Sequence, residues 1–162
     1  MGGRPNRVTV QVTAPLAGLV VALVDVPDPL YAGGMLGIGL AILPAEPDPP
    51  GLVVAVAPCS GRLTSVYPHA VMVAPDAERA VLVHLGLETA GLDGDEFEVG
   101  VGPGQRVTEG QALISWSPEA VRAGGRSTLC PVVALQAAAA DVLHVVAPGE
   151  QVEAGQVLLL WS

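Results

Sequence analysis

Two fifteen-residue stretches in the second half of the chain repeat one another. Residues 103–117, PGQRVTEGQALISWS, return as residues 148–162, PGEQVEAGQVLLLWS, at an offset of 45, and eight of the fifteen positions are identical. Each copy is typical of a tight turn leading into an apolar strand, because glycine suits places where φ is positive. A shorter pair, APLAG at 14–18 and APCSG at 57–61, repeats in the same way. Two such halves predict a β-sandwich with a pseudo-twofold internal repeat.

The rest of the chain has the spacing of an all-β protein. Short runs of Val, Leu and Ile are cut by Pro–Gly, Asp–Pro or Gly–Gly roughly every 8–12 residues, as in a sandwich or barrel. The clearest runs lie at 18–24, 52–57, 71–74, 80–87, 112–116 and 157–161. Residues 118–123 and 133–141 alone look helical, the second through its alanines. We therefore predict an all-β fold, a small antiparallel β-sandwich of the barrel-sandwich type with one or two short helices.

Domain organisation is expected to be simple. Residues 1–12 are expected to form an N-terminal arm or an entering strand, and residues 13–162 one domain. The uncharged stretch at 30–45 is shorter than the ~18 apolar residues of a membrane span, and four glycines interrupt it. It is better explained as strand and turn. Because the start of the chain also lacks an apolar signal core, we expect a cytoplasmic protein without membrane insertion.

Composition excludes several kinds of function. All seven basic residues are arginine, so a Schiff-base lysine, a P-loop lysine and a biotinyl or lipoyl lysine are absent from this sequence. The net charge of −9, without a basic cluster, argues against nucleic-acid binding. Cys59 and Cys130 are far apart in sequence and have no second pair beside them, so we expect two buried hydrophobic residues rather than a zinc site or disulfide framework.

Two of the three histidines flank a predicted hairpin. Residues 75–78, Pro-Asp-Ala-Glu, are typical of a turn between two apolar runs. If the hairpin is centred between Asp76 and Ala77, paired residue numbers sum to 153, and His69 faces His84. Directly opposed residues have Cβ atoms about 4.5–5.5 Å apart on the same face of the sheet. This register therefore predicts two adjacent imidazoles.

Alternation along the two strands assigns side chains to two faces. One face would hold Tyr67, His69, Val71, Leu82, His84 and Gly86, and the other Ala70, Met72, Val81, Val83 and Leu85. Both faces are apolar, so we expect one to be core and the other to form a docking surface around the imidazoles. A single histidine is more often a core or edge residue, which is our expectation for His144. Two histidines on facing positions, His69 and His84, favour a functional role over a structural one.

Neutral imidazole suits phosphoryl chemistry. Its ordinary pKa is near 6.5, so at neutral pH one nitrogen can attack phosphorus while the other is held by a hydrogen bond. Zinc is the competing interpretation, because histidine is a common zinc ligand. However, the His-x-His and His-Glu-x-x-His spacings of zinc hydrolases do not occur.

Residues 81–97, VLVHLGLETAGLDGDEF, resemble the active-site signature of the glucose-type enzyme IIA domain of the bacterial phosphoenolpyruvate-dependent sugar phosphotransferase system. Supporting motifs follow in the family's order at 14–18, 25–28, 68–70, 104–107 and 127–133. The resemblance runs from about Thr13 to Trp161, so the predicted domain at 13–162 would be enzyme IIA-like. It implies a small antiparallel β-sandwich, as the repeats do.

The resemblance also implies a mechanism and partners. His84 would accept a phosphoryl group from the phosphocarrier protein HPr and pass it to a cysteine of the enzyme IIB domain of a sugar permease. His69 would support the phosphoryl group without carrying it. The chain would thus be a protein-histidine phosphotransferase without a cofactor. The positions that the resemblance assigns to the docking surface are Asp28, Leu30, Tyr31, Leu36 and Glu88.

An alternative is a regulatory binding module of the same fold. Its histidine pair would serve a partner interface or hold a zinc ion there. One departure from the family lies beside His69, because Tyr67-Pro68 stands where the family has Thr-Asn. A hydroxyl that would orient an imidazole is therefore missing from that place.

Overall fold

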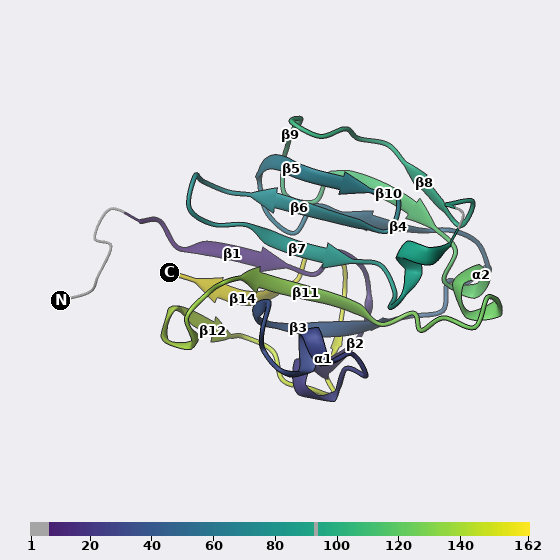
Figure 1. Cartoon of the computed structure of the whole chain (residues 1–162), viewed down its shortest axis with the longest axis horizontal. Coiled ribbons are helices and arrows are strands. Elements are labelled where there is room, and N and C mark those ends of the chain that lie inside the picture. The colour runs from purple at the N-terminus through teal and green to yellow at the C-terminus, as the bar shows by residue number, and fades with distance from the viewer. Residues whose placement is uncertain (1–6, 93) are drawn as a thin grey trace.

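The computed structural model describes residues 7–92 and 94–162, and these form fourteen strands in three antiparallel sheets (Figure 1). The largest sheet has eight strands, in the order β13 (Gln151–Val152), β2 (Gly18–Ala22), β3 (Gly37–Pro44), β11 (Cys130–Leu135), β7 (Val81–His84), β6 (Ala70–Ala74), β5 (Gly61–Tyr67) and β9 (Arg106–Val107). One small sheet holds β1 (Val10–Thr13), β14 (Val157–Trp161) and β12 (Val142–His144), and the other β4 (Val53–Val56), β10 (Ala112–Trp116) and β8 (Phe97–Val99).

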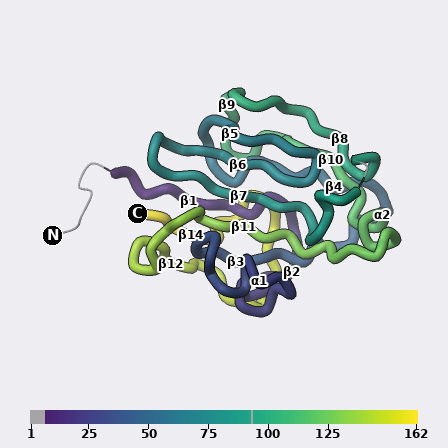
Figure 2. The backbone as a smooth tube through the Cα atoms, in the orientation of Figure 1, coloured from purple at the N-terminus to yellow at the C-terminus, as the bar shows by residue number. Residues whose placement is uncertain are grey.

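The main core lies between the large sheet and the two small ones (Figure 1, Figure 2). Alternate residues of the hairpin formed by β6 and β7, such as Val71 and Val83, point into it and are almost fully buried. The opposite face of the large sheet, called the outer face below, carries a second cluster of buried apolar side chains. Its members are Val26, Tyr31, Ala41, Ala70, Leu82, Leu87 and Val133. The large sheet is therefore apolar on both faces, and its outer face positions the histidines.

The internal repeat is visible in the backbone. Strands β13 and β14 lie 45 residues after β9 and β10, and β4 begins 43 residues after β1, as β5 does after β2. Hydrogen bonds repeat with the strands: the Ala14 N–H donates to the Gln156 carbonyl and the Ala57 N–H to the Gln111 carbonyl, both at 2.8 Å. The predicted antiparallel β-sandwich with a pseudo-twofold repeat is confirmed.

Two short α-helices are present in the described chain, and one was predicted. Helix α2 (Pro118–Ala123) begins with a proline, and the Ala120 N–H donates to the Ser117 hydroxyl at 3.0 Å. Helix α1 (Pro29–Ala32) lies where only strand and turn were expected. The Asp28 carboxylate caps this helix by accepting a hydrogen bond from the Leu30 N–H at 3.0 Å. Single 3-10 turns are η1 (Leu23–Asp25), η2 (Thr89–Gly91) and η3 (Ala139–Asp141).

The helix predicted at 133–141 is wrong. Val133–Leu135 completes β11, and η3 provides only one turn after it. Strand β11 lies between β3 and β7 in the large sheet, and Val132 and Val133 are fully buried there. Packing on both faces of the sheet therefore outweighs the helix propensity of the following alanines.

At the N-terminus, residues 10–12 of the expected arm belong to β1, which pairs with β14, and Val12 is fully buried. Residues 1–6 of that arm lie outside the described residues. No helix in the described part of the chain is long and apolar enough to cross a membrane. Cys59 and Cys130 are buried free thiols, as expected, and burial raises the pKa of each to about 12.

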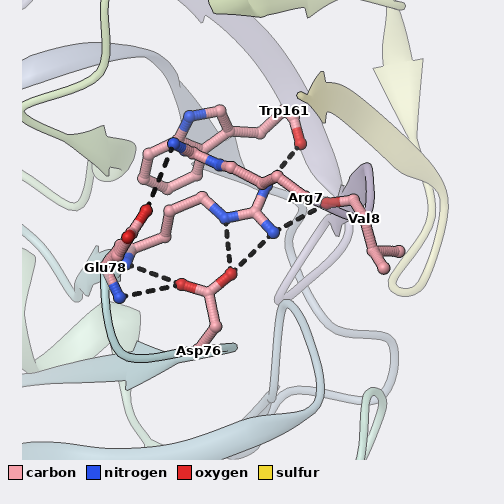
Figure 3. Close-up of polar contacts among 6 residues, drawn as sticks. Arg7, Val8, Asp76, Glu78 and Trp161 are labelled. Atoms are coloured by element: carbon pink, nitrogen blue, oxygen red, sulfur yellow. Dashed lines mark hydrogen bonds and ion pairs between the residues drawn. The ribbon is translucent and has the colours of Figure 1, made fainter. Parts of the chain in front are cut away.

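The buried residue Arg79 holds the connection between β6 and β7, which also carries Asp76 and Glu78, in place. Figure 3 shows Asp76 and Glu78 with Val8 and Trp161 of the neighbouring segments. The Nε of Arg79 donates to the Asp76 carboxylate at 2.8 Å, Nη1 to the Trp161 carbonyl at 2.8 Å and Nη2 to the Val8 carbonyl at 2.7 Å. Burial raises the pKa of Asp76, but its hydrogen bond to Arg79, the Glu78 N–H and the Arg79 charge bring the pKa below its usual range. This end of the hairpin is thereby fixed to β14 and to the segment that precedes β1.

Candidate functional site

His84 is the last residue of β7, and its ring is oriented by the main chain. Its Nδ1 lies 2.6 Å from the Gly86 carbonyl oxygen. A carbonyl oxygen only accepts hydrogen bonds, so Nδ1 carries the proton and donates it, which leaves the lone pair on Nε2. Gly86 has φ +80°, and a Cβ there would lie 2.7 Å from the Ser127 carbonyl oxygen. Glycine is therefore needed to place this carbonyl.

His69 lies in the turn between β5 and β6, beside His84. The His69 carbonyl accepts a hydrogen bond from the Leu85 N–H at 2.7 Å, which ties this turn to the residue after His84. The two imidazole centroids are 5.0 Å apart with an interplanar angle of 57°. Tyr67 stacks on His69 at 5.7 Å and 29°. The aromatic ring of Tyr67 thus contacts the imidazole at a place where the family has a threonine.

The structure brings the imidazoles together, but the register from which we predicted this is wrong. His84 pairs with Ala70, Val83 with Val71 and Val81 with Val73, so paired numbers sum to 154 rather than 153. The physical reason is the longer connection between β6 and β7. The Asp76 carboxylate closes it by accepting from the N–H groups of Glu78 and Arg79, at 3.0 and 2.9 Å.

The assignment of faces changes with the register. Val71, expected beside the histidines, lies in the main core. Ala70 and Met72, expected on the opposite face, lie with Leu82 at the outer cluster next to His84. His69 reaches His84 from the turn before β6 rather than from a facing strand position.

The predicted docking residues differ in their burial, and Tyr31 contacts the histidine pair. Tyr31 of α1 contacts His84 edge-on, with ring centroids 6.2 Å apart, and is buried. Burial and the nearby Asp28 raise the pKa of Tyr31 to about 12, so its hydroxyl stays protonated. Leu30 is half exposed on α1, and Leu36 packs partly buried against the outer cluster. Glu88 is exposed at the start of η2.

Both imidazoles are held neutral at ordinary pH. Burial is the larger cause that lowers the pKa of His69, and the charge that His84 can carry is the smaller one. Burial also lowers the pKa of His84, although the Gly86 carbonyl and Asp28 act in the opposite direction. Both residues remain partly exposed, so a visiting group can reach this place. The site is therefore a pair of neutral, accessible imidazoles in apolar surroundings.

Several features of this site were not predicted. The Gly86 carbonyl is a main-chain acceptor and leaves no side-chain signal, although a glycine two residues after a histidine is a usable hint. Arg126 was also missed: its Nε donates to the Glu88 carbonyl at 3.2 Å and steadies the segment after His84. His144, expected to have no function, has Nε2 3.1 Å from the Gly39 carbonyl.

The histidine pair brings two imidazoles within 5.0 Å of each other, measured between ring centroids. Within residues 7–92 and 94–162, no cluster of three histidine, cysteine, aspartate or glutamate side chains is positioned to hold a metal ion. A zinc ion at this place would need further ligands from a partner protein.

Comparison with known proteins agrees with this architecture. Residues 10–140 match the family model described as phosphoenolpyruvate-dependent sugar phosphotransferase system, EIIA 1. The chain belongs to this family, as the motifs in its sequence indicated.

Individual relatives extend the likeness over most of the chain. The PTS system glucose-specific EIIA component of Bacillus cereus is 37% identical over 143 residues, which are 87% of this chain and 82% of the relative. The solved structure of glucose permease IIA from Mycoplasma capricolum has a TM-score of 0.82 and 30% identity, and the match covers 95% of this chain and 96% of that one. The PTS system glucose-specific EIICBA component of Streptococcus pneumoniae is 42% identical over 118 residues, 72% of this chain but 15% of that protein.

Proposed function

We propose that this chain is a phosphoryl carrier in which His84 accepts the phosphoryl group and His69 stabilises it. The observation that carries the proposal is the hydrogen bond from His84 Nδ1 to the Gly86 carbonyl, because it leaves a lone pair on Nε2 of a partly exposed ring. Nε2 attacks phosphorus, the bond from phosphorus to the donor breaks, and its electron pair stays with the donor. Onward transfer reverses these roles, with the acceptor's nucleophile attacking phosphorus.

The surroundings of His84 suit such a transfer. Phosphoryl transfer requires positioning and stabilisation of charge rather than elaborate covalent chemistry. His69, with its centroid 5.0 Å away, is placed to donate a hydrogen bond to a phosphoryl oxygen. Tyr31 and the other apolar groups of the outer cluster would exclude water once a partner covers the site. No cofactor enters the proposed reaction.

The partners in this proposal are HPr as donor and enzyme IIB as acceptor. Support for the acceptor comes from the Streptococcus pneumoniae relative, whose name joins components C, B and A and of which this chain matches a part. The relatives' names specify glucose, so we infer a glucose-type permease as the system served. Asp28 and Glu88, with Leu30, Tyr31 and Leu36, would form the docking surface. A cytoplasmic location belongs to the same proposal.

The test is a reconstituted relay with phosphoenolpyruvate, enzyme I and HPr. The wild-type chain should gain an acid-labile phosphate and pass it to enzyme IIB. His84→Gln should gain none, and His69→Gln should be labelled but transfer onward far more slowly. His144→Gln is the matched control and should behave like wild type. Labelling that survives in His84→Gln would rule out this acceptor, and label that never leaves the wild-type protein would favour the regulatory module instead.

A further inference from the structure

A groove of about 600 Å³ crosses the outer face of the large sheet, at the end of the hairpin away from His84. Its walls include Arg62 and Thr64 of β5, Arg106 of β9, residues 75–80 and Gln136. The β6–β7 connection that borders it lies beside β1, whereas the other end of β7 runs toward α2 (Figure 1). The groove is therefore separate from the histidine pair.

Two arginines lie side by side in the wall of this groove. Arg62 and Arg106 are directly paired in the ladder between β5 and β9, and both are exposed. Directly opposed residues have Cβ atoms about 4.5–5.5 Å apart, and like charges in such positions are destabilising. Among the residues that the structure describes, neither guanidinium lies within ion-pair distance of a carboxylate. The fold thus keeps two repelling cations together.

The acidic groups of the groove are already engaged with other arginines (Figure 3). The Asp76 carboxylate lies 2.7 Å from Nη2 of Arg79, and its other oxygen accepts from two backbone N–H groups. The Glu78 carboxylate lies 3.9 Å from Nη1 of Arg7. A local positive charge consequently remains at Arg62 and Arg106 in a chain whose net charge is −9.

We propose that this groove binds a small phosphorylated, hydroxyl-bearing metabolite, with its phosphate between Arg62 and Arg106. Two guanidinium groups on adjacent strands can both bind one tetrahedral phosphate. The separate carboxylates of an acidic peptide would not require two guanidinium groups so close together. The volume lies within the roughly 300–1,000 Å³ of small-molecule sites. The Thr64 hydroxyl donates to the Met72 carbonyl at 3.4 Å, which leaves its oxygen free to accept from a ligand hydroxyl. Gln136 offers a second exposed polar side chain.

The experiment is a calorimetric titration with glucose 6-phosphate, orthophosphate and glucose. Wild type should bind glucose 6-phosphate saturably and more tightly than orthophosphate, and should not bind glucose. Arg62→Gln and Arg106→Gln should each weaken binding about tenfold or more, and the double variant should abolish it. Arg122→Gln, which removes an exposed arginine paired with Glu46 at 2.9 Å, is the matched control and should bind as wild type does.

Two further readouts keep the result independent of the relay. All these variants should still be phosphorylated at histidine by HPr, because the groove is separate from His84. Removing one of two facing charges should leave the melting temperature unchanged or raise it. In wild type, glucose 6-phosphate should shift the backbone amide signals of Thr64 and Arg106 rather than that of His84. This measurement locates the binding site even where a variant folds poorly.

Four results would overturn the proposal. The first is the absence of saturable binding of glucose 6-phosphate in the millimolar range. The second is binding that persists in the double variant. The third is orthophosphate binding as tight as that of glucose 6-phosphate, which describes a simple anion site. The fourth is tighter binding of a hexaglutamate peptide, which describes a protein-docking surface.

Discussion

The proton on the His84 ring is fixed by a main-chain atom two residues later. Because the Gly86 carbonyl accepts from Nδ1, substitution of neighbouring side chains leaves the tautomer in place. The ionisation of the ring depends on further groups, because burial lowers the pKa of His84 and Asp28 raises it. The Gly86 carbonyl therefore sets the tautomer, whereas the charge of the ring depends on burial, on that same carbonyl and on Asp28.

The contribution of Asp28 to the pKa of His84 gives a prediction for Asp28→Asn. The midpoint of the His84 titration should lie below about 6.5 in wild type and lower still in the variant, because removal of a negative charge disfavours the imidazolium. Asparagine can still cap α1, so the helix should persist. The measurement is the imidazole proton shift against pH, with Asp25→Asn as the control. A higher midpoint in Asp28→Asn would contradict the account.

The lowered histidine pKa values also bear on stability. The unfolded chain has histidine pKa values near 6.5 and binds more protons than the folded chain as pH falls below that value. The contribution of neutral His69 and His84 is therefore fully present above about 6.5 and is lost as pH falls through their folded pKa values. His69→Gln combined with His84→Gln should flatten this part of the stability profile in urea unfolding. A profile with unchanged slope would contradict the assignment.

At the scale of elements, the β6–β7 hairpin is held at both ends by different interactions. Near His84, the His69 carbonyl accepts from the Leu85 N–H. At the other end, Arg79 binds the Trp161 and Val8 carbonyls and lies 5.7 Å from the centroid of the Trp161 ring. The hairpin that positions the imidazoles is consequently fixed to the second layer of the sandwich.

Arg79→Met tests this attachment. The variant leaves two carbonyls and one carboxylate oxygen of Asp76 without the guanidinium donor, so we expect the free energy of unfolding to fall by about 2–4 kcal/mol. Arg122→Met breaks an exposed ion pair with Glu46 and should cost at most about 0.5 kcal/mol. Both values come from urea unfolding. Equal stability of the two variants would show that Arg79 does not hold the hairpin.

The whole molecule is built from two equivalent halves, and glycine is required at equivalent places. A Cβ at Gly18 would collide with the Leu43 carbonyl oxygen, and a Cβ at Gly61 with the Ala74 carbonyl oxygen. Both glycines begin a strand of the large sheet, β2 and β5. The repeat in sequence thus reflects a close backbone approach that occurs twice.

Gly18→Ala and Gly61→Ala should therefore be similarly damaging. Each must displace a neighbouring strand, so we expect a loss on the order of 2–4 kcal/mol in the free energy of unfolding. Gly51→Ala is the matched control: an added Cβ meets nothing within 4 Å there. Its stability should be unchanged or raised by up to about 1 kcal/mol. Tolerance of alanine at either Gly18 or Gly61 would contradict the equivalence.

Much of this architecture could be predicted because its signals are local. The turns and strands at 103–117 and 148–162 repeat as whole units, and α2 has both a serine cap and an initial proline. The register of β6 and β7 could not be predicted in the same way. It depends on the Asp76 carboxylate closing a longer connection, and one residue of difference exchanges the two faces.

Part of the candidate site could be predicted from the sequence for similar reasons. His69 and His84 stood out because they flank one hairpin, and the motif around His84 is distinctive. Residues 30–32 of α1 lie in an uncharged stretch that was interpreted as strand and turn, so the assignment of Tyr31 to the docking surface came from the family resemblance and not from a pattern. The contact of Tyr31 with His84 was not predicted. The orienting role of the Gly86 carbonyl emerges only when the turn is folded.

The most direct test of the account is the position of the phosphoryl group on the phosphorylated protein. Protein labelled with ¹⁵N and phosphorylated through HPr can be examined by proton–nitrogen correlation of the histidine side chains. We expect the phosphorus–nitrogen bond at Nε2 of His84, with the proton retained on Nδ1. Phosphorylation at Nδ1 of His84, or on His69, would contradict the claim that the Gly86 carbonyl selects the reactive nitrogen.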